Sequence, residues 1–525
     1  MRPFAALHAT GHAGCKRPRP GPGGSGRAIG AVRAVAHTGD LYPMEPTVAT
    51  LAKSLAETQT ALNIVWTLVA GFLVMFMQAG FALVETGLVR AKNVAHTMAM
   101  NFLVYAIGII GFYFIGFGLQ MGSVGAMATF GGEATLSAAP IAISLFGKTW
   151  NLAGTSGFML PFEMFTPAVA AMFLFQMVFM DTTCTIPTGA CAERWKFTSF
   201  VIFSFVIATV IYPIYANWVW GGGWLAQLGA NAGLGHGHVD FAGSSVVHMT
   251  GGVIAITIGK LLGPRIGKYG PDGRVNPIPA HNIPQVITGT FILAFGWFGF
   301  NAGSTLAGTD TRIAIVATNT MLASATGAFA AYLYVKARLG KPDPTWLANG
   351  MLAGLVAITA PCAFVSSWAA MLIGAIAGVL VVVAAMFIEQ KLKIDDPVGA
   401  AAVHGVNGAW GIVSLGLFAN GAYGDGWNGV AGPVKGLFYG DSGQLVAELI
   451  GIAANILYVA PVAALAFFVI GKIVGNRVSA EDEVAGLDIP EMGIPGYTFD
   501  ASPHPGILHE RGHAQSAPVA QAQIR

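Results

Sequence analysis

The sequence predicts an all-α polytopic membrane protein with eleven transmembrane helices. Of its 525 residues, 54% are hydrophobic and only 10% are charged, whereas an average soluble protein carries about 25% charged residues. Apolar stretches of about 20 residues, the length that crosses a bilayer, recur along the chain. The loops between these stretches are alternately rich and poor in lysine and arginine. The net charge of +2 gives no reason to expect a nucleic-acid partner.

Residues 1–57 are expected to form a basic extension outside the membrane domain. The first 47 residues hold six lysines and arginines among Gly, Pro and Ala, without the apolar core of a secretory signal. A transit peptide is one interpretation. We favour a disordered tail, or translation that starts at Met44.

Residues 58–476 are expected to form the transmembrane domain. Its 11 apolar segments lie near residues 62–88, 97–119, 163–190, 198–217, 242–263, 284–303, 311–337, 345–365, 366–390, 398–420 and 444–474. The chain also has 70 glycines, which suits closely packed helices in lipid. Residues 477–525 are expected to form a cytoplasmic tail that is disordered near its end.

The charge of the connecting loops predicts the orientation, because cytoplasmic loops are rich in Lys and Arg. The poor side has only Lys148, Arg312 and Lys435. The rich side has Arg90, Lys92, Arg194, Lys196, Lys260, Arg265, Lys268, Arg274, Lys336, Arg338, Lys341, Lys391, Lys393, Lys472 and Arg477. We therefore expect the N-terminus outside and the C-terminus inside.

One short stretch occurs twice. Asp240 is followed by a glycine three residues on and by His248 eight residues on, and Asp396 is followed in the same way by His404. In the predicted topology the two helices run in opposite directions, five helices apart. This predicts an inverted repeat, helices 1–5 and 6–10, plus a final helix. Such folds place the substrate site near the bilayer midplane.

Histidines at membrane depth are costly and therefore suggest function. A single buried histidine often only bonds a backbone carbonyl, but a symmetric pair favours a function. Two ligands are too few for zinc. Bis-histidine haem needs two histidine ligands and so fits the number present, but the surrounding chain does not suggest a haem pocket. A proton relay or a pore lining remains, so we expect no metal, no cofactor and no enzymatic activity.

Three aromatic clusters accompany the histidines. Phe175 and Phe179 share one helix face, and residues 217–224 and 297–304 place Trp220 and Ser304 at the outer ends of two helices. Packed cores and interfacial tryptophan belts give the same patterns. An outer site of aromatic rings and a hydroxyl also suits a small cation, since each ring contributes about 0.5–2 kcal/mol.

Together these motifs resemble the ammonium transporters of the Amt/Mep/Rh family, over roughly residues 58–490. The resemblance rests on Gly87–Asn93, Ala192–Arg194, Trp220–Gly223, Asp240–His248, Gly296–Ser304 and Asp395–Gly405. Both the Trp and the Ser of the outer site are present, which is similar to the Amt branch rather than the Rh branch.

The resemblance implies a homotrimer in the plasma (inner) membrane, surrounded by lipid, that transports ammonium or ammonia, with methylammonium as a surrogate. It implies a possible PII-type regulatory partner at the cytoplasmic face. The residue roles that it implies are recruitment by Trp220, Phe179 and Ser304 with support from Asp240, a gate of Phe179 and Phe300, and a pore of His248, His404, Phe175 and Trp297.

A mechanism follows from desolvation, because a bare cation crosses a dry constriction only at high cost. We expect ammonium to lose its proton near the gate, ammonia to pass the histidines, and the proton to follow through them. Diffusion of neutral ammonia alone is the competing mechanism. Asp240 also suits a helix cap. An ammonium sensor that signals through the tail is the alternative function.

Overall fold

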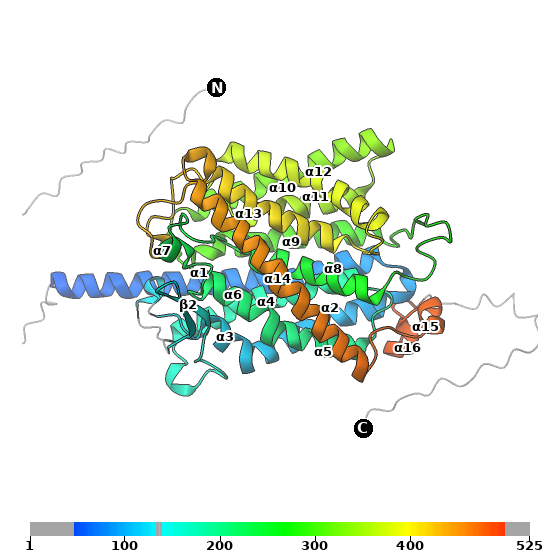
Figure 1. Ribbon diagram of the computed structural model, residues 1–525, viewed down its shortest axis with the longest axis horizontal. Helices are drawn as coiled ribbons and strands as arrows, with labels where there is room; N and C mark the ends of the chain where they lie inside the picture. Colours follow the sequence, from blue (N-terminus) through cyan, green and yellow to red (C-terminus); the bar gives the residue numbers. More distant parts are fainter. Residues whose placement is uncertain (1–46, 126, 133–135, 137–138, 499–525) are drawn as a thin grey trace, which may run out of the picture. The chain divides into compact units, whose positions relative to one another are not determined.

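Long apolar helices make up most of the chain in the computed structural model (Figure 1), which describes residues 47–498 except 126, 133–135 and 137–138. Most of the expected extension and the end of the tail lie outside these residues. The chain divides into two units, Met1–Leu51 and Ala52–Arg525. Apart from the first turn of α1, the description below concerns the second unit.

The helices and strands have the following bounds. The helices are α1 (Val48–Leu88), α2 (Val94–Gly111), α3 (Phe117–Met121), α4 (Pro167–Cys191), α5 (Phe197–Val206), α6 (Tyr212–Trp220), α7 (Leu228–Ala232), α8 (Thr250–Leu262), α9 (Ile283–Asn301), α10 (Ile313–Leu339), α11 (Pro344–Thr359), α12 (Ser367–Gln390), α13 (Asn407–Phe418), α14 (Ser442–Ile473), α15 (Ala480–Ala485) and α16 (Asp488–Met492); the strands are β1 (Ile141–Leu145) and β2 (Lys148–Ala153).

Ten helical stretches in the described ranges are long and apolar enough to cross a membrane. The shorter apolar helix α11 accounts for the remaining predicted segment. Two predicted boundaries were wrong. The first helix begins at Val48 rather than residue 62, because its first turns are polar and exposed and hydropathy does not detect them. The segment predicted at 345–365 ends at Thr359, since the N–H of Ala360 donates to the Ser244 hydroxyl and Pro361 has no N–H to continue the helix.

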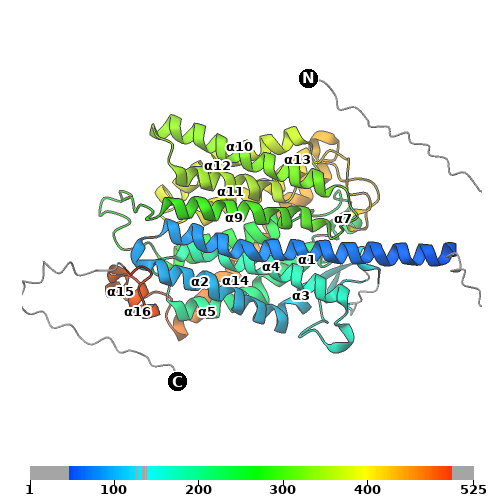
Figure 2. The ribbon, with the colours of Figure 1, turned by 180° about the vertical axis from the view of Figure 1, so that it is seen from behind.

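One antiparallel hairpin departs from the all-α prediction. Strand β1 pairs with β2 in the long loop between α3 and α4. The residues of β1 are exposed, whereas β2 ends at the buried Ala153. The protein is therefore mostly helical (Figures 1 and 2). Its buried hydrophobic residues come mainly from the long helices.

Four of the helical stretches contain a π-helical turn. Two of these turns are Ser244–Met249, which leads into α8, and Ala401–Val406, which leads into α13. π-helical turns are rare and occur often at functional sites. These two turns carry His248 and His404, respectively.

A buried ionic cluster joins the loops on the Lys- and Arg-rich side. The carboxylate of Asp395 accepts hydrogen bonds from the backbone N, Nε and Nη2 of Arg265 at 2.8–2.9 Å. Arg265 also donates to Glu193 at 2.7 Å. Arg194 donates to the backbone carbonyl of Asp395 at 2.7 Å. Burial raises the pKa of Asp395, but the hydrogen bonds and charge of Arg265 outweigh burial and hold that pKa well below its ordinary value.

The Asp395→Ala variant is expected to be less stable than the wild type by about 3–5 kcal/mol, because it leaves the buried Arg265 short of its main counter-charge. Thermal unfolding of the detergent-solubilised protein measures the difference. The control is Glu57→Ala, which breaks only an exposed pair with Lys53. Because the pKa of Asp395 is depressed, its contribution is complete above the ordinary carboxyl range and is lost as pH falls through the folded-state pKa. Equal midpoints for Asp395→Ala and wild type would contradict this account.

Candidate functional site

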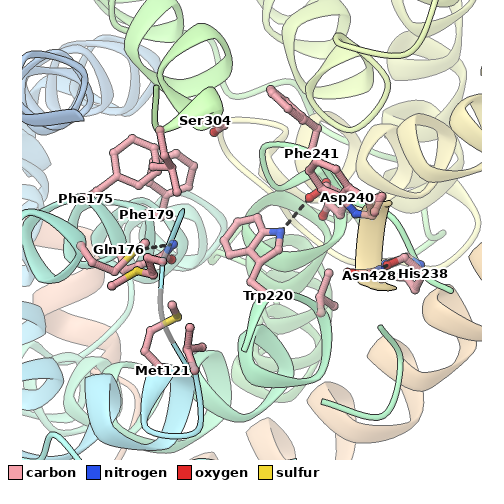
Figure 3. Close-up of a pocket in the computed structure, with 16 residues that line it drawn as sticks. Met121, Phe175, Gln176, Phe179, Trp220, His238, Asp240, Phe241, Ser304 and Asn428 are labelled. Carbon is pink, nitrogen blue, oxygen red and sulfur yellow. Dashed lines mark hydrogen bonds between the residues drawn. The ribbon is translucent and has the colours of Figure 1, made fainter. Parts of the chain in front are cut away.

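A pocket of about 230 Å³, called the outer pocket after the predicted orientation, brings together the residues that the sequence analysis assigned to recruitment (Figure 3). Phe179 comes from α4, Trp220 from the end of α6, Ser304 from the 3-10 turn after α9, and Asp240 from the loop before the first π-helical turn. Phe175 also lines this pocket. Residues far apart in the chain thus line one pocket.

The polar groups of the pocket are oriented by the backbone. The Trp220 indole Nε1 donates to the carbonyl of Asp240 at 2.7 Å, which fixes the ring (Figure 3). The hydroxyl of Ser304 donates to the carbonyl of Phe300 at 2.7 Å. Because its proton is used in this way, the Ser304 oxygen offers lone pairs to the pocket. Such an oxygen accepts from a ligand that donates hydrogen bonds.

Stacked phenyl rings close the bottom of the pocket. Phe179 and Phe300 stack with ring centroids 4.1 Å apart, and Phe175 lies 4.6 Å from Phe179. Trp220 meets Phe179 edge-on at 5.9 Å. Phe179 and Phe300 are almost completely buried. A ligand that leaves the pocket in this direction must displace or pass the rings.

The two predicted histidines lie directly beyond this stack. The ring of His248 stacks on Phe300 at 5.3 Å and on Trp297 at 5.2 Å. His248 Nδ1 lies 3.1 Å from His404 Nδ1, and both side chains are buried. One nitrogen must donate and the other accept, so the two imidazoles share a proton position. The alternative in which each histidine merely bonds a backbone carbonyl does not describe this contact.

The repeated sequence motif has a repeated geometry. The carboxylate of Asp240 accepts from four backbone N–H groups, those of residues 243–246, at 2.7–2.9 Å and from the Ser245 hydroxyl at 2.8 Å. The carboxylate of Asp396 accepts from the N–H groups of Gly399 and Ala401. In both copies the aspartate caps the start of the segment that carries the histidine. These capping hydrogen bonds occupy the carboxylate oxygens of both aspartates.

Two glycines that the sequence analysis missed make the histidine contact possible. Gly252 follows His248 by four residues, and Gly408 follows His404 by four. A methyl group on Gly252 would collide with the backbone of Gly405, and one on Gly408 would lie 2.9 Å from the nitrogen of Met249. Each copy of the motif therefore packs its glycine against the other copy. The matched spacing from the histidines was a detectable signal.

On the other side of His404, a cavity of about 20 Å³ is lined by His404, Glu85 and Asn349. A larger cavity of about 160 Å³, lined by Asn349 and Asp396, follows it. Glu85 accepts from Thr188 at 2.8–2.9 Å and from Asn101 at 2.7 Å. The sequence analysis missed Glu85 and Asn349, although an acidic residue inside an apolar segment was a signal for the first.

Within the described ranges, no cluster of three His, Cys, Asp or Glu side chains is placed to hold a metal ion. The site consists of an aromatic pocket, a phenyl stack, a histidine pair and a narrow inner cavity, in that order. This arrangement suits the passage of a small molecule and a proton rather than the binding of a large ligand.

Comparison with known proteins relates the chain to one family. The profile of the Ammonium Transporter Family matches residues 65–497. Ammonium transporter Amt2 of Archaeoglobus fulgidus is 43% identical over 451 residues, which cover 85% of this chain and 90% of the relative. Ammonium transporter Amt1 of Haloferax mediterranei is 37% identical, with 85% and 81% covered.

Two solved structures are also similar. A protein described as "Sensor Amt Protein" matches with a TM-score of 0.72 at 34% identity, and the match covers 83% of this chain and 99% of that one. Mep2 of Candida albicans matches with a TM-score of 0.66 at 25% identity, and the match covers 80% and 87%, respectively.

Proposed function

Because this chain belongs to the ammonium transporter family, we propose that it recruits ammonium at the outer pocket and conducts ammonia past the phenyl stack and the histidine pair. The protein is an integral multi-pass membrane protein, as its apolar helices require. The plasma membrane is the location consistent with this function. The observation that carries the proposal is the order of pocket, stack and histidine pair along one line of contacts.

Recruitment is proposed for Trp220, Phe179 and Ser304. The two rings offer cation–π attraction, and the Ser304 oxygen accepts a hydrogen bond, which ammonium donates and potassium does not. Asp240 is proposed to support recruitment through the backbone that it caps, because the surrounding amides already use its oxygens. Phe179 and Phe300 are proposed as the gate.

The histidine pair is proposed to carry the proton. Ammonia passes His248 and His404 between walls that include Phe175 and Trp297, and the proton transfers through the two imidazoles. The short Nδ1 to Nδ1 distance supports this route. Neutral ammonia diffusion without charge is the competing mechanism.

The internal repeat, the number of membrane helices and the oligomeric state are also proposals. The matched capping and glycine contacts of the two motifs support an inverted repeat of helices 1–5 and 6–10 plus a final helix. We propose eleven membrane helices over residues 58–476, an extension at 1–57 that lies outside, and a cytoplasmic tail at 477–525. A homotrimer in lipid, and a PII-type partner at the tail, are proposed from the family alone.

The second candidate function is an ammonium sensor that signals through the tail. One relative is described as a sensor, but the curated relatives quoted above are named transporters. Transport is therefore the function that we propose, and no enzymatic step is part of it.

The variants Trp220→Leu and Ser304→Ala test recruitment. Each is expected to raise the half-saturating ammonium concentration by about 2- to 30-fold, the equivalent of one lost cation contact. Competition of ammonium with labelled methylammonium uptake measures it. Trp150→Leu, which changes a tryptophan of β2 outside the pocket lining, is the control. Unchanged affinity in both pocket variants would place recruitment elsewhere.

A further inference from the structure

A third histidine, His238, borders the outer pocket and has no role in the proposed pathway. It lies in the loop after α7 and its side chain is fully buried. His238 Nδ1 lies 2.6 Å from Oε2 of Glu448 on α14, which is also fully buried. His238 Nε2 lies 2.9 Å from the Ser245 hydroxyl. Figure 3 shows His238 beside Asn428, on the Asp240 side of the pocket.

The surrounding hydrogen bonds determine where the protons of this pair lie. The Ser245 hydroxyl donates to Asp240 at 2.8 Å, so its oxygen accepts from His238 Nε2–H. His238 Nδ1 then lies 2.6 Å from Glu448 Oε2 as an ion pair, and the pair must carry a proton on one of these atoms because two lone pairs would repel at this distance. The other carboxylate oxygen, Oε1, already accepts from the Val239 N–H at 3.1 Å and from Gln444 at 2.7 Å. The pair therefore holds one proton more than a neutral imidazole beside a carboxylate.

This proton completes a chain of contacts that ends in the pocket. Glu448 forms an ion pair with His238, and His238 hydrogen-bonds to Ser245. Ser245 in turn donates a hydrogen bond to the carboxylate of Asp240. The carbonyl of Asp240 holds the indole of Trp220. The same carboxylate caps the segment that carries His248. The recruiting ring and the start of the pore segment thus depend on one aspartate.

We propose that His238 and Glu448 form a proton-holding pair that positions Asp240 and Trp220 for ammonium recruitment only while the pair shares its proton. The inference rests on the proposed function. His238 and Glu448 are positioning residues, since they act through Ser245 and Asp240 and do not themselves touch the ligand.

Loss of the shared proton interrupts the series of contacts from Glu448 to Asp240 in either tautomer of His238. If Nε2 keeps its hydrogen, the Nδ1 lone pair faces the Glu448 carboxylate and that contact is lost. If Nδ1 takes the hydrogen, Nε2 becomes an acceptor, and the Ser245 hydroxyl turns toward it and leaves Asp240. Recruitment is weakened in both cases.

The titratable groups that face His238 set the pH range. They are Glu448 on α14, Asp240 on its own loop and Tyr215 on α6, whose hydroxyl donates to the Gly451 carbonyl. His236, two residues away, bonds the Gly432 carbonyl through Nε2. Burial lowers the pKa of His238, but the charge and hydrogen bond of Glu448 outweigh burial and raise this pKa above its ordinary value. The break is therefore expected above the ordinary imidazole range, which lies near pH 6.5.

Glu448→Gln tests the proposal without removing a side chain. Its carbonyl oxygen keeps the two contacts of Oε1, and its amide donates to His238 Nδ1, so the chain stays complete at every pH. In proteoliposomes, with concentrations expressed as the ammonium ion at each pH, the wild-type half-saturating concentration is expected to rise about tenfold between about pH 6 and pH 8.5. Glu448→Gln is expected to remain near the low-pH wild-type value throughout. His238→Ala is expected to show the raised value at every pH.

His236→Gln is the matched control, because it removes another buried imidazole of the same loop and should keep the wild-type pH response. The same pH response in Glu448→Gln as in wild type, or wild-type affinity in His238→Ala, would overturn the proposal. A wild type with no ammonium current would overturn the proposed function instead. In that case thermal unfolding still tests the pair, because only the wild type should lose stability as pH rises through the raised pKa of His238. Parallel profiles of stability against pH for wild type and Glu448→Gln would then overturn the proposed His238–Glu448 pair.

Discussion

Replacing His248 with alanine is expected to reduce the ammonium-driven current to background, a loss of about 100-fold or more if both imidazoles are needed for proton transfer. The same loss is expected for His404→Ala. Among the residues that the structure describes, each ring is the only proton partner that the other has at its Nδ1, across 3.1 Å. Removing either ring therefore ends the route, and the remaining histidine cannot pass the proton on.

The current of reconstituted protein, measured after an ammonium pulse, tests this prediction. His281→Ala is the control, because it removes a loop histidine that contacts the Val89 carbonyl and lies away from the pore. Full current in His248→Ala and His404→Ala would contradict the relay. A wild type that gives ammonia-driven alkalinisation of the vesicles but no current would leave the histidines as pore lining for neutral ammonia.

Gly252→Ala is expected to give the second large effect, a loss of stability of about 1–3 kcal/mol or more together with loss of transport. The added methyl group has no room, because it would collide with the backbone of Gly405, next to His404. The collision forces the two pore segments apart and lengthens the histidine contact. Thermal unfolding and ammonium current, measured on the same preparation, report the two losses.

Gly259→Ala is a matched control on the same helix. A methyl group at Gly259 would make only ordinary contacts, the nearest at 3.6 Å to Ile394. It should be neutral or slightly stabilising, since alanine favours helix by up to about 1 kcal/mol over glycine. If Gly252→Ala is as stable and as active as Gly259→Ala, close packing at Gly252 does not maintain the histidine pair.

The sequence predicted the helices well because hydropathy reports directly on burial in lipid. The prediction was wrong where a property other than hydropathy determines the structure. The first turns of α1 mix polar with apolar residues, and β1 is apolar but only five residues long, so neither is identified by a search for membrane-length apolar segments. The end of α11 at Thr359 depends on the hydrogen bond from Ala360 to Ser244 and on the missing N–H of Pro361 rather than on apolar length.

The candidate site was predictable in its residues but not in its contacts. The repeated spacing of aspartate and histidine indicated His248 and His404 before any geometry was known. The 3.1 Å contact between the rings, the role of Gly252 in permitting it and the pair of His238 with Glu448 depend on helices far apart in the chain. Spacing within one segment carries no information on such distances.

The most direct test of the central claim compares equal pulses of ammonium and potassium on proteoliposomes that contain the wild-type protein. The account predicts a transient inward current for ammonium and none for potassium, because only ammonium donates to the Ser304 oxygen and gives up its proton before the phenyl stack. Equal currents for both ions would contradict the selectivity of the outer pocket. Alkalinisation of the vesicle interior without current would contradict transfer of the proton through His248 and His404.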